Sequence, residues 1–393
     1  MLIRPVDRKI FEERVFPREY SVMVYTDGSH YYAKDQMGNT ICQDSPTACI
    51  QEAVDYVYSN NGGGMIFIKS GIYTITNPIN IVYDAPIALV GETPFKQSMT
   101  NELGITLIKY TGPSGNANEP VSVINADSSR FLNQQYVMLR DLVISLVGKA
   151  YPYTRAVNLN HVNKFWVERV KVSADGMYNP ATDNYGFYTN AQGGNGGVMI
   201  DTFSMNFYAA YKLFLDHFVG IRMQALYSQL GFWLHYSGSE IVLVNPHAYS
   251  CITSSFHVVL TYGGSATLVE PYSEGTPKYD YYFAGTNQYI TLINPRAYRN
   301  PPVTYFSSVD FNKLSIVGGT IKLKSSGTST ILANQTRVTV NHNLVATPSK
   351  VLITPLATPP GKLWVENITS TSFDIVTDTA PTVDLKVAWY AEV

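Results

Sequence analysis

Residues 241–246 read IVLVNP, and similar hexamers return as ATLVEP at 266–271 and ITLINP at 290–295. LSIVGG at 314–319 continues the series without the proline. The first residues of these runs, at positions 241, 266, 290 and 314, are separated by 25, 24 and 24 positions. A repeat of this length is typical of a solenoid, in which each copy forms one coil.

The corner that ends each run is the second part of the pattern. Proline cannot donate a hydrogen bond to a neighbouring strand and fixes its own φ, so we expect it to end the strand at the same place in each coil. Asn245, Glu270 and Asn294 precede the three prolines and should stack on one another. Looser copies begin at Val137, Phe165 and Leu213, the last of these two coils after Phe165.

The length of the repeating region sets the size of the solenoid. At ~24 residues a coil, the region that ends at Lys324 accommodates roughly 11 coils, stacked into a rod of about 50 Å at the usual strand spacing. An open stack of strands needs covered ends, because uncovered edges invite further strands.

A helix is predicted ahead of the first coil, in DSPTACIQEAVDYVYSNNGGG at 44–64. Ser45 can cap a helix over residues 46–60 that begins with Pro46, which needs no hydrogen-bonded amide at that place. Apolar residues at helical spacing give this helix one buried face: Ile50, Ala53, Val54 and Val57. The strands MIFIK and IYTIT follow, with Gly71 at the corner between them.

This order of helix, glycine run, strand and Gly-Ile-Tyr resembles the opening of the pectate-lyase-like superfamily, whose members include polysaccharide lyases and virus tailspikes. The resemblance covers residues 44–91. It implies an all-β fold, a right-handed parallel β-helix over residues 44–324, with the helix covering the first coil. An N-terminal segment, residues 1–43, precedes it and has no clear period.

Residues 328–393 change character. After the small-residue stretch KSSGTST, expected to be a linker, six short alternating runs are spaced about ten residues apart, which is typical of a small antiparallel β-sandwich. VTVNHNL and WVENITSTSFDI resemble the small β domain that closes many phage and archaeal-virus tail and spike proteins.

Composition excludes several classes of partner. The 393 residues carry a formal net charge of −2 and no Lys/Arg run, so we expect no nucleic-acid binding. No stretch approaches the ~20 apolar residues of a membrane span, and the charged start argues against membrane insertion and against a cleaved signal peptide. The histidines lack metal-ligand spacing, so no metal and no cofactor are expected. The three cysteines are expected to be small buried hydrophobes, and pairing of Cys42 with Cys49 stays open.

Catalytic equipment is weakly represented. The motifs of polygalacturonase-like enzymes are absent from the sequence, and Arg296 and Arg299 have no acidic cluster at matching coil positions that would hold the calcium of a pectate lyase. A glycosidase needs two carboxyl groups roughly 5–9.5 Å apart. Glu270, Glu274 and Asp280 are the candidates, although a corner position for Glu270 and solvated loop positions for the other two are the simpler interpretations.

A binding surface is better supported. Two places beyond each corner residue are His247, Tyr272 and Arg296, and two places further are Tyr249, Glu274 and Tyr298. Stacked at coil spacing, they would form a strip of planar rings and polar tips suited to a sugar or a protein, or would simply cover the rod. Residues 178–201 form the longest polar insertion, expected to be an exposed recognition loop with three tyrosines: Tyr178, Tyr185 and Tyr188.

Together these features favour a tailspike-like protein of the virion surface, outside the cell, that attaches to a glycan or protein of the host envelope. By resemblance we expect a homotrimer, with the N-terminal segment contacting other virion proteins. The alternative is a polysaccharide lyase or glycoside hydrolase on the same scaffold, and a third reading is a purely structural component.

Overall fold

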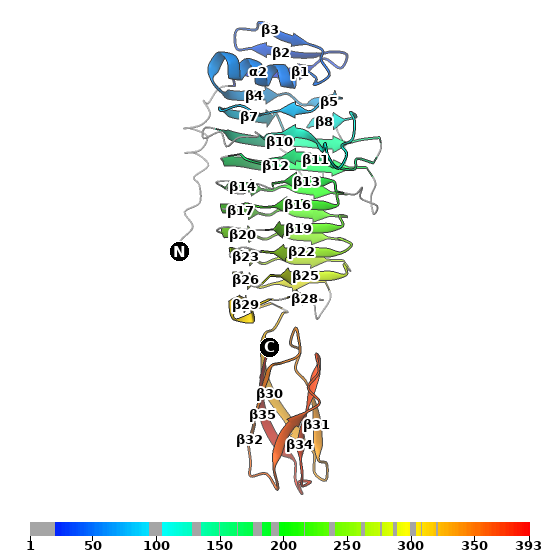
Figure 1. Cartoon of the computed structure of the whole chain (residues 1–393), viewed down its shortest axis with the longest axis vertical. Coiled ribbons are helices and arrows are strands. Elements are labelled where there is room, and N and C mark those ends of the chain that lie inside the picture. The colour runs from blue at the N-terminus through cyan, green and yellow to red at the C-terminus, as the bar shows by residue number, and fades with distance from the viewer. Residues whose placement is uncertain are drawn as a thin grey trace.

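The repeat in the sequence is a stack of parallel strands. The computed structural model describes residues 20–93, 104–127, 135–148, 150–162, 164–175, 183–189, 196–215, 217–235, 240–260, 264–275, 277–285, 289–298, 304–307, 309–319 and 321–393. Ile241 pairs with Ala266, Ala266 with Ile290, and Ile290 with Leu314, each on the neighbouring parallel strand. The predicted register is confirmed, and the fold is a parallel β-helix followed by two small antiparallel sheets (Figure 1).

Each coil contributes strands to three faces, and the long parallel sheets are those expected of right-handed winding. The first face consists of β4 (Gly64–Ile68), β7 (Pro86–Gly91), β14 (Gly197–Ile200), β17 (His217–Ile221), β20 (Glu240–Val244), β23 (Ser265–Val269), β26 (Tyr289–Ile293) and β29 (Leu314–Val317). The second face consists of β5 (Gly71–Ile75), β8 (Thr106–Tyr110), β15 (Phe203–Met205), β18 (Gln224–Leu226), β21 (His247–Tyr249), β24 (Tyr272–Glu274) and β27 (Arg296–Ala297).

Two long strands cross both of these faces, namely β10 (Tyr136–Leu146) and β12 (Lys164–Ala174). The third face consists of β6 (Ile79–Asn80), β9 (Val121–Asn125), β11 (Thr154–Asn158), β13 (Tyr185–Tyr188), β16 (Ala209–Leu213), β19 (Leu230–His235), β22 (Ser254–Val259), β25 (Tyr279–Ala284) and β28 (Thr304–Ser307). A short 3-10 helix, η1 (Phe311–Lys313), precedes β29.

The predicted position of Leu213 is wrong. Val137 and Phe165 do pair, as expected, but the first-face strand two coils after Phe165 carries Phe218. Leu213 lies in β16 on the third face, beside Leu234. The intervening coil is longer than the average period, so counting 24 residues at a time ends on the wrong face.

The corner between the first and second faces depends on backbone conformation more than on proline. Seven consecutive coils place a residue with φ between 49° and 59° at this corner: Asp141, Arg169, Asp201, Arg222, Asn245, Glu270 and Asn294. Only the last three are followed by proline. The left-handed residue therefore turns the chain, and backbone hydrogen bonds continue through the turn, as from Asn245 N–H to the Val269 carbonyl (2.8 Å).

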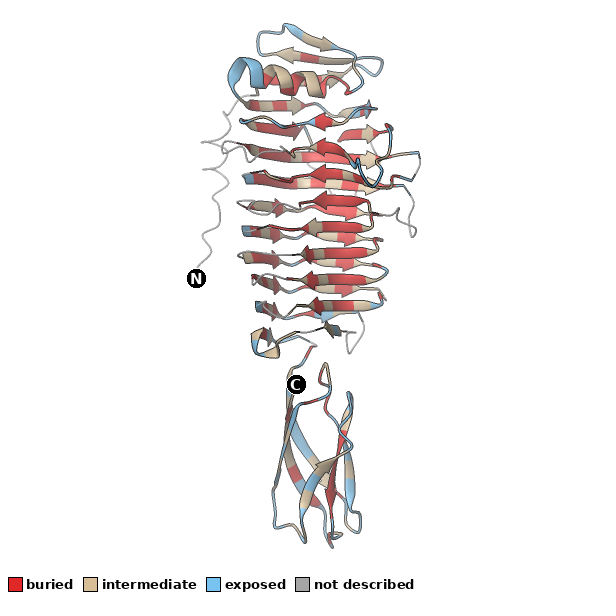
Figure 2. Cartoon of the chain, in the orientation of Figure 1, coloured by how far each residue is buried: buried red, intermediate tan, exposed pale blue. Residues whose placement is uncertain are grey.

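The interior is an uninterrupted apolar column (Figure 2). Its third-face wall is a stack of nearly parallel rings, with neighbouring centroids 4.9–5.2 Å apart and interplanar angles of 2–11°: Phe187, Tyr211, Phe232, Phe256 and Tyr281. Each ring is fully buried. Aromatic residues at the same place in successive coils thus fill the core and also fix the register, because a slipped coil would break the stack.

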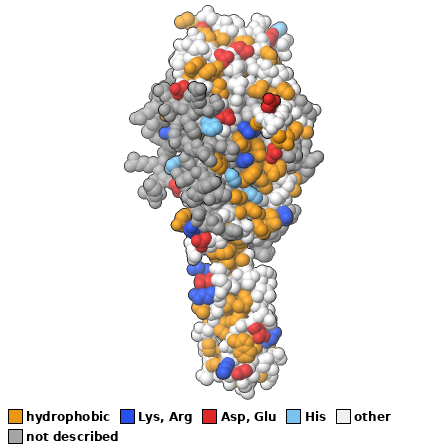
Figure 3. Space-filling view, viewed as in Figure 1, with side chains coloured by type: hydrophobic (Ala, Val, Ile, Leu, Met, Phe, Trp, Pro, Cys, Tyr) orange, Lys and Arg blue, Asp and Glu red, His pale blue; other side chains and the backbone are white. Residues whose placement is uncertain are grey.

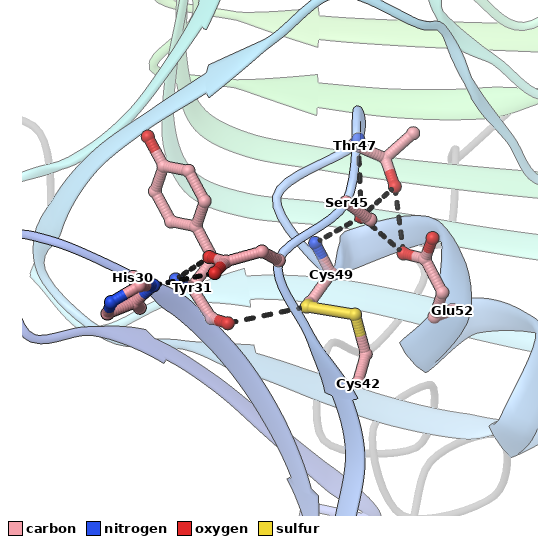
Figure 4. Close-up of a disulfide and its surroundings, with 8 residues drawn as sticks. His30, Tyr31, Cys42, Ser45, Thr47, Cys49 and Glu52 are labelled. Carbon is pink, nitrogen blue, oxygen red and sulfur yellow. Dashed lines mark hydrogen bonds and ion pairs between the residues drawn. A yellow bond between two sulfur atoms is a disulfide. The ribbon is translucent and has the colours of Figure 1, made fainter.

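The N-terminal end is covered by α2 (Ile50–Asn61) and by the antiparallel strands β1 (Val22–Thr26), β2 (Tyr31–Asp35) and β3 (Thr40–Gln43). The predicted apolar face of the helix is buried. The predicted start at residue 46 is wrong, because Ser45 accepts the Cys49 amide in a turn before the helix and donates to Glu52 (Figure 4).

The structure also settles the cysteines. Cys42, at the end of β3, forms a disulfide with Cys49, the residue that precedes α2 (Figure 4). The bond ties the outermost hairpin to the helix that covers the first coil. Cys251 is a buried free thiol whose pKa is raised to about 12 by burial.

The C-terminal sheets are thin. One contains β30 (Lys324–Ile331), β35 (Leu385–Glu392) and β32 (Lys350–Pro355), and the other contains β31 (Arg337–Asn341), β34 (Ser372–Thr377) and β33 (Leu363–Glu366). KSSGTST, expected to be a linker, is the first part of β30, where its backbone pairs with β35. Val393 N–H donates to the Leu323 carbonyl (3.0 Å), so the chain end returns to the base of the β-helix.

Candidate functional site

The predicted strip lies on the second face. His247, Tyr272 and Arg296 occupy equivalent places on β21, β24 and β27, and Tyr249 pairs with Glu274 in the same way. The His247 and Tyr272 rings stack at 5.1 Å with an angle of 18°. The Arg296 guanidinium lies over the other side of the row, 5.5 Å from the Tyr272 ring centroid.

Side chains in this strip are partly engaged with one another. His247 Nε2 is 2.9 Å from Glu274 Oε2, and both side chains are about one third exposed, at 30% and 34%. Burial raises the pKa of Tyr272, and the charge of Glu274 adds to the effect. Tyr298, just beyond the strip, is 69% exposed. The arrangement offers rings and hydrogen-bonding tips on adjacent coils.

The three candidate carboxylates do not come together on one surface. Glu270 is an exposed corner residue with φ of 51°. Glu274 belongs to the strip. Asp280, expected in a solvated loop, is fully buried in β25, where its carboxylate accepts a hydrogen bond from the Ser273 hydroxyl (2.6 Å). An interior Asp280 cannot reach a glycan at the surface without rearrangement of the coil.

The predicted tyrosine loop is also different from the expectation. Tyr185 and Tyr188 are in β13 on the third face, and only 8% and 5% of their surface is exposed. Tyr178 lies outside the described residues. The polar insertion is thus interrupted by a strand whose two tyrosines are part of a larger surface.

That surface, which we name the basic aromatic face, runs down the outside of the third face. Its main row pairs residue to residue through six consecutive strands: Tyr188, Lys212, Trp233, His257, Tyr282 and Tyr305. Tyr185 and Arg155 flank its upper end, at β13 and β11. Figure 3 shows hydrophobic side chains with Lys, Arg and His among them on this side of the β-helix.

Rings and cations alternate along the row. The Lys212 ammonium lies 4.5 Å from the Trp233 ring centroid, 5.0 Å from Tyr185 and 5.3 Å from Tyr188. The Arg155 guanidinium lies 3.8 Å from the Tyr188 centroid. Further down, His257 stacks on Tyr282 at 4.3 Å, and Tyr282 on Tyr305 at 4.9 Å.

Several polar atoms of this face lack a partner inside the protein. Four buried nitrogen atoms have no hydrogen-bond partner: Arg155 Nε, Trp233 Nε1, His235 Nδ1 and His257 Nδ1. Burial lowers the pKa of His257 to about 4, with a smaller effect from His235. Buried polar groups are normally satisfied, so a concentration of unpaired nitrogens marks this face as unusual.

Sequence reasoning missed the basic aromatic face as a unit, although a signal was present. Each of five coils carries an inward aromatic residue followed at once by an outward row residue: Phe187–Tyr188, Tyr211–Lys212, Phe232–Trp233, Phe256–His257 and Tyr281–Tyr282. The pairs recur every 21–25 residues. A search for aromatic pairs at the coil period would have located the row.

Other kinds of site receive no support from the described ranges. They contain no group of three or more His, Cys, Asp or Glu side chains that could hold a metal ion. None of the helices in those ranges has the length and hydropathy that a membrane span requires.

Comparison with known proteins gives a likeness of fold. No family model matches the chain, and no curated protein matches its sequence. The A-module of a mannuronan C-5 epimerase from Azotobacter vinelandii matches with 16% identity and a TM-score of 0.41, over 71% of this chain and 72% of that one. The Dettilon tailspike protein matches with 10% identity and a TM-score of 0.35, over 94% of each chain.

A third match is the tailspike protein of Acinetobacter baumannii bacteriophage Fri1, described as a capsular polysaccharide depolymerase. Its identity is 10% and its TM-score 0.36, over 88% of this chain and 82% of that one.

Proposed function

We propose that this chain is a tailspike-like protein of the virion surface that attaches to a glycan of the host envelope. The observation that carries the proposal is the basic aromatic face, a row of half-buried rings on consecutive coils. Aromatic side chains offer an apolar body to the apolar side of a sugar ring, and Tyr, Trp and His tips can bond its hydroxyl groups. Because the strands hold the rings in place, little side-chain freedom is lost on binding.

A glycan array followed by cell adhesion tests the proposal. We expect the full chain to bind a subset of surface glycans, and Trp233→Ala to weaken that binding at least tenfold. Tyr289→Ala is the matched control, since Tyr289 is 59% exposed but lies on the first face. Absence of any glycan binding, or an equal loss in both variants, would contradict the proposal.

The His247 strip is the second surface for the same ligand or for a protein receptor. It differs from the basic aromatic face in having an ion pair between its rings rather than unpaired cations. Tyr272→Ala should then reduce adhesion to cells without changing glycan binding at the basic aromatic face. Assembly as a homotrimer through the rods belongs to this proposal, and a light-scattering mass equal to one chain would contradict it.

The alternative function is a polysaccharide lyase or glycoside hydrolase. The observation that favours it is the hydrogen-bonded pair of His247 and Glu274 beside Tyr272, because such pairs can transfer protons. Incubation with host-surface polysaccharides, followed by reducing-end and unsaturated-uronate assays, decides between the two functions. Product formation that Glu274→Gln abolishes would establish the enzyme.

A further inference from the structure

We propose that Arg155 and Lys212 form a subsite for the carboxylate of an acidic sugar at the upper end of the basic aromatic face. The inference rests on the proposed glycan binding and adds the chemical class of the ligand. Both cations lie against the ring of Tyr188, at 3.8 Å and 5.3 Å from its centroid, so they are neighbours on one surface.

The charges of this pair are not compensated within the described chain. No described carboxylate lies within ion-pair distance of either side chain, although both are half-buried. Removing a cation from water is unfavourable unless an anion or hydrogen bonds replace the solvent. The pKa of Lys212 is lowered first by burial and then by the positive charge of Arg155. Two like charges are therefore held together where an anion between them would relieve both costs.

The nearby acids are engaged elsewhere. Asp183 acts on Lys212 from a distance, but its carboxylate accepts the Tyr185 hydroxyl (3.2 Å). Asp127 is paired with His161 Nδ1 at 2.8 Å. His235 adds a further nitrogen without a partner on the β19 side, and its pKa is lowered by burial and then by Lys212. The field at the subsite is thus positive, with no internal anion in contact.

The geometry favours a carboxylate attached to a sugar ring. Arg155 offers a planar fork suited to the two oxygens of a carboxylate, and its Nε has no internal acceptor. The Lys212 ammonium is fixed by three ring faces instead of moving freely on its stem. Trp233 and then His257 and Tyr282 continue the row, so a chain of sugars anchored by one acidic unit could lie on the rings that follow.

The test compares oligomers of galacturonic acid with the same oligomers after reduction of their carboxyl groups. We expect the full chain to bind the acidic form at least tenfold more tightly at low salt, with the preference falling as salt rises. Lys212→Met and Arg155→Leu should each abolish most of this preference while the affinity for the reduced form changes less than twofold. Lys212→Arg should retain it.

Lys34→Met is the matched control, because Lys34 also lies over a tyrosine ring, 5.7 Å from Tyr25, but on the N-terminal hairpin. Thermal unfolding confirms that each variant folds, and Arg155→Lys, which keeps the charge without the fork, gives an intermediate preference. Equal affinity for both oligomers, or a preference that survives in the Lys212→Met and Arg155→Leu double variant, overturns the subsite. Binding of array glycans that are all neutral overturns it too and leaves the glycan-binding proposal intact, whereas no glycan binding at all overturns that broader proposal.

Discussion

The β-helix and the C-terminal sandwich bury their cores in different ways. In the β-helix every inward residue is covered by equivalents on the coils before and after it, so one core cluster extends from Val22 to Ile321. The sandwich has eight buried apolar residues between two three-stranded sheets, and outward side chains such as Leu352 and Leu356 are more than half exposed. A repeated core spreads its stability over many similar interfaces, whereas a small one concentrates it in a few residues.

The largest expected effect is the loss of an aromatic ring from the smaller core. Phe373 is fully buried in the sandwich against His342 and Trp389. Phe373→Ala should lower the free energy of unfolding of this region by about 3–5 kcal/mol, because it leaves a cavity and removes apolar contacts. Calorimetry of the full chain should show the sandwich transition lost and the β-helix transition kept.

Phe256→Ala is the matched change in the β-helix, since Phe256 is also fully buried in a stack of rings. Its cost should be similar in energy, yet the β-helix should stay folded because the other coils remain in register. Simultaneous unfolding of both regions in either variant would show that they behave as one cooperative unit, and the comparison would fail.

Acid should weaken the β-helix first. The His257 pKa is about 4, below its ordinary 6.5, so the unfolded chain binds the proton more readily between these values. The stabilisation is fully present above about pH 6.5 and is lost as the pH falls toward 4, on the order of 1–2 kcal/mol for a half-buried ring. His235 and Lys212, which face the same surface, act in the same direction as repelling cations.

Midpoints of thermal unfolding from pH 7 to 4.5 test this, and His257→Gln should remove part of the slope. In the sandwich, hydrogen bonds from Asn367 and Thr339 lower the pKa of Asp374 below its ordinary 3.8. The stability that Asp374 contributes is therefore present above pH 3.8 and lost only at lower pH. A slope that is unchanged in His257→Gln would contradict the assignment.

The corner predicts a smaller, stabilising effect. Glu270 has a left-handed backbone, which costs a residue with a Cβ atom about 1–2 kcal/mol and costs asparagine less. Glu270→Asn should raise the stability of the β-helix by about 0.5–1 kcal/mol. Asn294→Glu, the reverse change one coil later, should lower it by a similar amount. Equal melting temperatures for the two variants would mean that the corner conformation is not what selects asparagine.

Surface ion pairs should give the smallest effect. Arg222 and Asp201 form a two-pronged pair at the first corner, with side chains 56% and 37% exposed, and Arg222→Met should change stability by about 0.5 kcal/mol or less. Arg337 in the sandwich contacts both Glu366 and the nearly buried Asp374, so Arg337→Met should cost about 1 kcal/mol. Denaturant titration of each region would measure the difference.

The candidate site was only partly readable from the sequence. His247, Tyr272 and Arg296 follow a corner of nearly constant spacing, so their stacking could be counted out. Arg155 and Lys212 could not be brought together in this way, because the coil between β12 and β14 has 32 residues from Phe165 to Gly197, and the next has 21 from Gly197 to Phe218. Asp280 likewise reads as a loop acid until the strand that contains it is seen to turn inward.

The sequence by itself determined the architecture: a period near 24, apolar inward positions and a corner residue tolerant of left-handed backbone leave a stacked solenoid as the way to bury every coil. The tertiary structure alone decided which outward side chains are neighbours. Contacts between coils join residues some two dozen positions apart, and every insertion shifts that distance. The basic aromatic face therefore exists only once the strands are in register.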